Sequence, residues 1–206
     1  MITEHKIEQR SDAWFALRCG RITASNFGIV MGKPGITRTK YLRKLAAQQV
    51  TGIVQEGYTN AAMQRGVDEE PNACAYYEFM NDCTVTETGF FTRDDLPLCG
   101  CSPDGLVDDD GVVEFKVPGQ DTHAGYLLDG YKVPSSYRWQ VVGHLLFTGR
   151  NWCDFMSYSP EGMRPHLVRV IRDDVEDDLT KLTHGLLMAS KEVEEIAAKL
   201  RGSTGE

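Results

Sequence analysis

An apolar run near the middle of the chain carries an acid and a base among residues typical of a buried strand. The run covers residues 112–117, VVEFKV, and places Glu114 and Lys116 two positions apart. Because side chains alternate between the two faces of a strand, Glu114 and Lys116 point the same way, while their apolar neighbours point into a core. Charged groups in such surroundings are costly unless they pair or serve a purpose. The run therefore predicts a sheet with a functional site on one face.

The SPDG segment before this strand supplies a second carboxylate, Asp104. We expect a hairpin loop of three residues, 109–111, which places Asp104 opposite Lys116. That loop type ends in a left-handed residue, usually glycine, and Gly111 occupies the position. A two-residue loop would instead put Asp104 on the other face. The turn chemistry thus predicts that Asp104, Glu114 and Lys116 share one face.

Two carboxylates on one face suit a hard cation such as Mg²⁺, which prefers oxygen ligands and keeps several waters. The main-chain carbonyl of Phe115 is a further candidate ligand. The cation would polarise a phosphate, while Lys116 could orient or deprotonate the attacking water or stabilise the charged transition state. The alternative is a surface salt bridge between Glu114 and Lys116, which the SPDG context and the matching hairpin disfavour. We expect a Mg²⁺-dependent nuclease in which Mn²⁺ can substitute and two ions act during turnover.

In the rest of the chain, apolar residues recur with the spacing typical of helices in some segments and with that typical of strands in others. Ser11–Asp12 can cap a short helix that ends at Arg18, and Thr23 or Ser25 can cap a second one that ends at Met31. Further helices are predicted at residues 38–51, 61–80, 135–148 and 173–201, and strands at residues 83–91, 98–107, 112–117, 152–159 and 166–172. No repeat or linker interrupts this order. We therefore expect a single nuclease domain over residues 1–206, of the α/β class, with a central mixed β-sheet flanked by helices.

Composition excludes several classes of protein. No apolar run approaches the roughly 20 residues of a membrane span, and the N-terminus lacks the order of a secretory signal. The expected location is therefore the cytoplasm, with no membrane partner. The six cysteines are scattered, which favours reduced thiols, and Cys99 and Cys101 are interpreted as small core residues rather than a metal-binding pair.

The charge of the chain is unevenly distributed. A formal net charge of −8 argues against an indiscriminate polyanion binder. Residues 33–44 nevertheless hold five cations and no acid, whereas residues 173–178 are almost entirely acidic. The basic segment is either the solvated side of a helix or a local DNA-binding face, and the sequence leaves both interpretations open.

Four segments resemble the lambda-type phage exonucleases, which are viral recombinase nucleases of the PD-(D/E)-x-K superfamily. They are AWFALRCGRITAS at residues 13–25, residues 66–70, SPDGLV with EFKVP, and YRWQV at residues 137–141. Their order and spacing together are specific, and they span most of the chain. The resemblance implies a restriction-endonuclease-like core and a 5′→3′ exonuclease that digests one strand of double-stranded DNA from its end and leaves 3′ overhangs. It also implies a ring-shaped homotrimer that works with a single-strand annealing protein, in a bacterial or phage-infected cell.

The resemblance assigns roles around the expected metal site. Asp104, Glu114 and Lys116 match the catalytic positions. Glu70 matches an acid that joins the metal site, and the adjacent Glu69 is its rival. Gln140 matches a polar position near the active site on a late helix, although a valine replaces the second glutamine of the family's pattern.

The resemblance also assigns residues to the DNA end. Arg18 matches a residue that holds the 5′-terminal phosphate, a task that suits its planar fork. Ser25 could add a hydroxyl to the same phosphate or simply cap a helix. Met63 lies where the family places an apolar wedge that splits the terminal base pairs, with a buried core methionine as the alternative. Lys33 and Arg38 belong to the basic segment that we expect to contact the duplex downstream.

Two other functions remain open from the sequence. A structure- or sequence-selective endonuclease of the same superfamily would share the metal site but cut internally. A non-catalytic DNA-binding or assembly protein would not need the three catalytic positions, and all three are present. A relative with an iron–sulfur cluster would need a C-terminal set of cysteines, and none follows Cys153.

Overall fold

A five-stranded sheet forms the centre of the fold, in the order β3-β6-β7-β8-β9. The computed structural model describes residues 1–54 and 61–202, and the side chains of residues 61–63 are outside the described part. The strands of this sheet are β3 (Val85–Thr86), β6 (Gly105–Val107), β7 (Gly111–Lys116), β8 (Trp152–Ser157) and β9 (His166–Ile171). Only β7 and β8 pair in parallel; the other neighbours are antiparallel. The prediction of a mixed central sheet is therefore confirmed.

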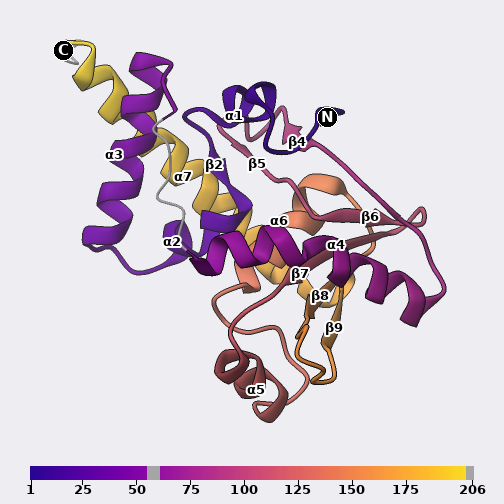
Figure 1. The fold of residues 1–206 in the computed structure, drawn as a ribbon. Coiled ribbons are helices and arrows are strands. Elements are labelled where there is room, and N and C mark those ends of the chain that lie inside the picture. The colour runs from indigo at the N-terminus through magenta and orange to yellow at the C-terminus, as the bar shows by residue number, and fades with distance from the viewer. Residues whose placement is uncertain (55–60, 203–206) are drawn as a thin grey trace.

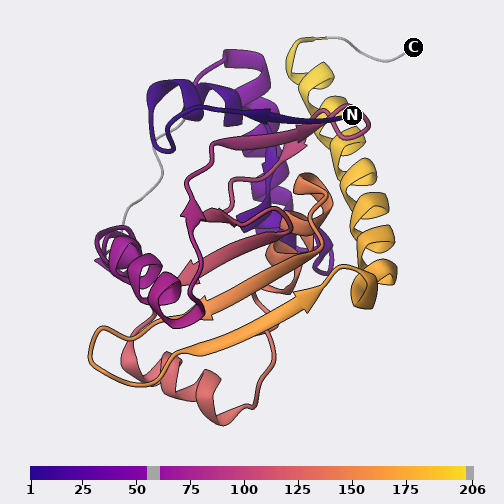
Figure 2. The same cartoon turned by 90° about the vertical axis from the view of Figure 1, so that its right-hand side faces the viewer.

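Helices cover both faces of this sheet (Figures 1 and 2). The longer ones are α3 (Ile36–Thr51), α4 (Ala61–Asn81), α6 (Arg138–Thr148) and α7 (Glu176–Leu200), and the shorter ones are α1 (Asp12–Arg18), α2 (Phe27–Met31), α5 (Gln120–Leu128) and the 3-10 turns η1 (Ala24–Asn26) and η2 (Asp173–Val175). Helix α4 packs on one face, where Ala73 and Tyr77 contact Val113 and Phe115. Helix α6 packs on the other face, and α2, α3 and α7 form a further layer beyond it.

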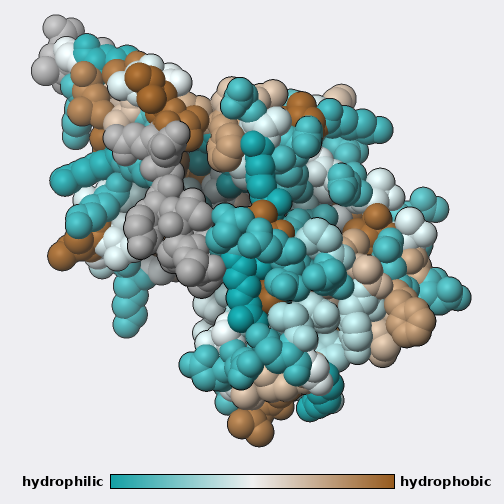
Figure 3. Space-filling view, viewed as in Figure 1, coloured by the Kyte–Doolittle hydropathy of each residue, from teal (hydrophilic) through white to brown (hydrophobic). Residues whose placement is uncertain are grey.

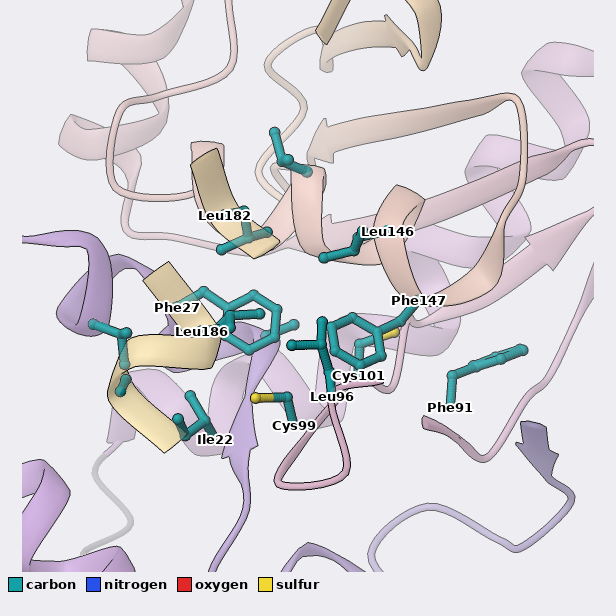
Figure 4. Packing of buried hydrophobic residues seen from close by; sticks show 14 of the residues in the cluster. Ile22, Phe27, Phe91, Leu96, Cys99, Cys101, Leu146, Phe147, Leu182 and Leu186 are labelled. Carbon is teal, nitrogen blue, oxygen red and sulfur yellow. The ribbon is translucent and has the colours of Figure 1, made fainter. Parts of the chain in front are cut away.

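The larger hydrophobic core lies between the sheet and α2, α6 and α7 (Figure 4). Phe27, Phe147 and Leu186 fill its centre, and all three are fully buried. Cys99 and Cys101 belong to the same cluster, and all six cysteines are free. Both thiols are thus core residues, as predicted.

Two small sheets extend the fold beside the central one. In the first, β1 (Ile2–His5) pairs with β4 (Phe90–Arg93), and in the second, β2 (Ile22–Thr23) pairs with β5 (Cys99–Gly100). The single strand predicted at residues 83–91 was wrong, because β3 and β4 belong to different sheets. The segment predicted as one strand at residues 98–107 likewise divides into β5 and β6.

The β6–β7 hairpin differs from the predicted register by two residues. Val107 lies opposite Gly111, so the loop comprises residues 108–110 and its left-handed residue is Asp108, with φ of 46°. The prediction of a left-handed Gly111 was wrong. Continuing the observed register places Asp104 opposite Glu114 rather than Lys116. A shift of two residues keeps every side chain on its original face, so the predicted common face survives.

The exterior is mainly polar. Figure 3 shows hydrophilic side chains over most of the face that carries α4, with hydrophobic atoms in scattered groups. Across residues 1–54 and 61–202, no helix has the length and apolar character needed to cross a membrane.

Candidate active site

Three charged side chains meet where β6 begins and β7 ends. Asp104 directly precedes β6, and one of its carboxylate oxygens accepts a 2.6 Å hydrogen bond from the main-chain N–H of Phe115. Glu114 and Lys116 extend from the same face of β7 and form an ion pair. Glu114 is buried, with 1% of its surface exposed, whereas the side chain of Lys116 retains 25%. The structure thus brings together the three residues that the strand pattern singled out.

Helix α6 supplies two further contacts to Glu114. Gln140 donates from Nε2 to Oε1 at 2.5 Å, and His144 donates from Nε2 to Oε2 at 2.7 Å. These residues are four positions apart, so they lie on the same side of the helix, one turn from each other. Glu114 therefore receives three donors, and its negative charge is compensated although it is buried.

The two carboxyls ionise differently. Burial opposes ionisation of Glu114, but the Lys116 ammonium and the hydrogen bond from His144 outweigh it and lower the pKa of Glu114 to about 2. Burial and the nearby charge of Glu114 raise the pKa of Asp104 well above its ordinary value. Burial also opposes the charged form of Lys116, but Glu114 and Asp104 raise the pKa of Lys116. These surroundings favour the ammonium form of Lys116, which can stabilise negative charge or orient a water.

The oxygen atoms of this site that are not fully used in hydrogen bonds suit a magnesium ion. A carboxylate has about four lone-pair positions that can accept a hydrogen bond or bind a metal. Hydrogen-bond donors occupy three of these positions on Glu114 and one on Asp104. Phe115 lies beyond the last β6–β7 residue pair, and because its N–H points to Asp104, its carbonyl faces the same side of the strand. Within the described residues no three His, Cys, Asp or Glu side chains form a metal cluster. Two carboxylates and a carbonyl, with waters completing the shell, match the habit of Mg²⁺.

Glu70 and Glu69 point to different partners. Glu70, on α4, binds Arg10 at 2.6 Å, and its negative charge also contributes to the raised pKa of Asp104, after burial and Glu114. Glu69 instead accepts a 2.9 Å hydrogen bond from Asn72 on the exposed side of the helix. Of the two acids, the structure brings Glu70 toward Asp104.

Arg18, at the end of α1, lies against aromatic rings. Its guanidinium is 3.8 Å from the centre of the Trp14 ring and 5.7 Å from that of Phe90. Burial lowers the pKa of Arg18 to about 10, and no carboxylate in the described part of the chain forms an ion pair with it. The indole N–H of Trp14 donates to the Ser102 hydroxyl at 2.8 Å, which links α1 to the segment that carries Asp104.

The remaining residues expected at the DNA end lie in varied surroundings. Ser25 is exposed and accepts a weak 3.3 Å hydrogen bond from Asn26, and no side-chain cap forms at the start of η1. Lys33 is exposed in the loop before α3. Arg38 is bound by both oxygens of Glu192 on α7, at 2.6 and 2.7 Å, so it is not a free surface cation. The side chain of Met63 lies outside the described residues.

Sequence reasoning missed His144. A single histidine on the apolar helix at residues 135–148 has the appearance of an ordinary core residue. A signal was nevertheless available, because His144 follows Gln140 by four positions and must share its side of the helix.

The fold agrees with comparisons against known proteins. Residues 13–151 match the model of the YqaJ-like viral recombinase domain. The chain belongs to this family. It is 34% identical to an alkaline exonuclease from Laribacter hongkongensis, over 94% of this chain and 100% of that one, with a TM-score of 0.80. The same alkaline exonuclease was also solved in complex with dAMP.

A more distant structure supports the YqaJ-like fold alone. A phage-related exonuclease from Haemophilus somnus 129PT has a TM-score of 0.68 at 12% identity, covering 90% of this chain and 96% of that one. No curated protein sequence matched the chain. Family membership, together with the similarity to the alkaline exonuclease, makes the chain a nuclease of the exonuclease type and confirms the resemblance drawn from its motifs.

Proposed function

We propose that the chain is a Mg²⁺-dependent exonuclease that digests one strand of linear duplex DNA from its 5′ end and leaves a 3′ single-stranded overhang. The observation that carries the proposal is the convergence of Asp104, Glu114 and Lys116 at one end of β7. The expected substitution of Mn²⁺ and the use of two ions belong to the same proposal.

The residues divide the work of phosphodiester hydrolysis. Asp104, Glu114 and the Phe115 carbonyl would hold Mg²⁺, which polarises the phosphate and lowers the pKa of bound water. The Lys116 ammonium would stabilise the negative charge that develops on the phosphate oxygens. Gln140 would keep the Glu114 carboxylate in one orientation, and Glu70 would join the site through water.

The proposed direction of digestion rests on Arg18 and on family membership. A half-buried guanidinium that forms no ion pair with the described residues is ready to bind an anion, and the aromatic rings beside it restrict its motion. A terminal 5′-phosphate held there, with Ser25 as a further donor, would set the first phosphodiester bond of that strand near Asp104. The wedge role of Met63 and the duplex contacts of Lys33 and Arg38 rest on the resemblance. For Arg38, such a contact would require release from Glu192.

The proposed partners also rest on the resemblance. They are double-stranded DNA ends, a single-strand annealing protein and two further copies of the chain in a ring. The proposed place of action is the cytoplasm of a bacterial or phage-infected cell.

The decisive assay compares blunt linear duplex with closed circular duplex in Mg²⁺. We expect loss of the linear DNA and an intact circle, with a 5′ label released as mononucleotide while a 3′ label stays in long strands. Lys116→Ala should lose about 10²–10³-fold in rate, as expected when one transition-state contact is removed, while retaining DNA binding. Lys181→Ala, an exposed lysine on α7, is the matched control and should keep full activity. Cleavage of the circle would establish an endonuclease instead.

A second assay tests the 5′-phosphate anchor. Arg18→Ala should slow digestion of 5′-phosphorylated ends much more than that of 5′-hydroxyl ends, because only the former offer the phosphate. Arg43→Ala, an exposed cation in the basic segment, should reduce binding of both ends equally. Equal losses for both ends in Arg18→Ala would remove Arg18 from this role.

A further inference from the structure

His144 is a fully buried histidine that contacts the candidate active site from helix α6. It projects from α6 and contacts the carboxylate of Glu114 through Nε2, at 2.7 Å from Oε2. Gln140, one turn earlier, contacts the other oxygen. The motifs of the chain assign no role to His144.

The two oxygens of Glu114 are held unequally. Oε1 accepts from both Lys116 and Gln140, whereas the only donor to Oε2 among the described residues is His144. Glu114 is buried and lies close enough to Cys101 and Cys153 for its charge to add to the effect of burial in raising the pKa of each thiol. Glu114 therefore lies near buried thiols, and loss of His144 would leave Oε2 without a donor among the described residues.

The other ring nitrogen of His144 indicates how the ring is used. Nδ1 is buried and has no hydrogen-bond partner in the described part of the chain. The nitrogen that faces a carboxylate must carry a proton, and a second proton on Nδ1 would be a buried donor without an acceptor. Within the described residues the ring therefore contacts Glu114 through Nε2 alone.

We propose that His144 is the positioning residue of the metal site: it fixes the Glu114 carboxylate so that the free lone pair of Glu114 faces Asp104. The inference rests on the proposed metal-dependent function and deepens it. Residues that hydrogen-bond to a metal-ligating carboxylate hold it in the orientation that the metal needs. Their loss typically weakens metal affinity or activity by about 10–100-fold. His144 acts through its contact with Glu114.

The test is binding of Mn²⁺ to the DNA-free protein, measured by calorimetry and by the paramagnetic signal of free Mn²⁺. His144→Leu should weaken Mn²⁺ binding about 10–100-fold, whereas His144→Gln, which keeps one N–H donor, should restore most of the affinity. His123→Leu is the matched control, since His123 is equally buried but contacts Ser157 and the Arg164 carbonyl instead. This variant should bind Mn²⁺ like the wild type in its folded fraction, whatever its melting temperature.

Activity provides a second measurement. For His144→Leu the Mg²⁺ concentration giving half-maximal rate should rise, and saturating Mg²⁺ should recover most of the rate. If His144→Leu does not fold, His144→Ala with added imidazole replaces it, and imidazole should restore Mn²⁺ binding. Wild-type affinity in a folded His144→Leu, no recovery with His144→Gln, or no imidazole rescue would overturn the inference alone. A wild-type protein that binds no Mn²⁺ would overturn the proposed metal function as well.

Discussion

At position 111 the absence of a side chain leaves room for an indole ring. A Cβ on Gly111 would lie 2.1 Å from atoms of the Trp152 ring, on the neighbouring strand β8. That ring cannot easily withdraw, because the Arg169 guanidinium lies 3.6 Å from its centre and is itself held by both oxygens of Asp154. Gly111 is therefore required for close packing between strands and not for the turn.

Gly111→Ala should lower the free energy of unfolding by about 1–3 kcal/mol, the usual cost of overpacking a well-filled site. Gly66→Ala is the matched control. Gly66 lies within α4 with no atom within 4 Å of its added Cβ, so alanine should stabilise the helix by up to about 1 kcal/mol. Urea unfolding of both variants gives the comparison. Equal stabilities would show that Trp152 moves aside without cost.

At the scale of elements, helices α3 and α7 lie side by side and are joined across their surfaces by one bidentate ion pair (Figure 1). Arg38 donates to both oxygens of Glu192. Glu192 is the more open partner, with 40% of its side chain exposed, so water weakens the pair. Its contribution to stability should be within about 0.2–1 kcal/mol.

Glu192→Gln should remove that contribution, and its effect should depend on pH. The hydrogen bond from Arg38 lowers the pKa of Glu192 below its ordinary 4.5. Stabilisation from Glu192 is therefore present above about pH 4.5 and is lost as the pH falls below it. Thermal unfolding at pH 7 and at low pH should show the variant and the wild type converging in acid. Glu195→Gln serves as the control, because Glu195 is exposed on the same helix and forms no ion pair with the residues described; an identical pH response in both variants would contradict the assignment.

The elements that the sequence predicted best are those whose pattern is local. Alternation along β7 placed Glu114 and Lys116 on one face, and the cap of α1 forms as expected, with Ser11 accepting from the Trp14 N–H. The hairpin register was missed because the left-handed position belongs to Asp108, and aspartate tolerates this conformation better than most residues other than glycine. Helix α5 was missed because it has neither a side-chain cap nor a clear apolar stripe. Contacts between distant segments, such as Arg38 with Glu192, depend on packing that no local pattern reveals.

At the scale of the whole molecule, the chain carries a net charge of −8 and yet is proposed to act on a polyanion. Exposed cations at Lys33, Lys40, Arg43 and Lys44 are concentrated in α3 and the loop before it. A ring of three copies would bring three such segments around one duplex and would repel DNA elsewhere. The proposed ring thus reconciles the acidic total with a local attraction for DNA.

Sedimentation equilibrium should therefore give a mass about three times that of the 23.0 kDa chain. With linear duplex in excess, each DNA molecule that the ring encloses should be digested to a short remnant, while most of the other DNA molecules remain intact. Lys116→Ala should sediment as the same species, because Lys116 acts in the site and not in assembly. A monomer that yields an evenly shortened ladder of products would contradict the ring.

The parallel pairing of β7 with β8 separates Glu114 along the chain from the helix that contacts it. A parallel partner requires a crossover, and here the crossover contains α5 and α6. Glu114 therefore precedes Gln140 by 26 residues and His144 by 30, and Arg38 precedes Glu192 by 154. A nascent chain thus carries Glu114 before the helix that contacts it has been synthesised. We therefore expect a chain truncated before α6 to lack cleavage activity.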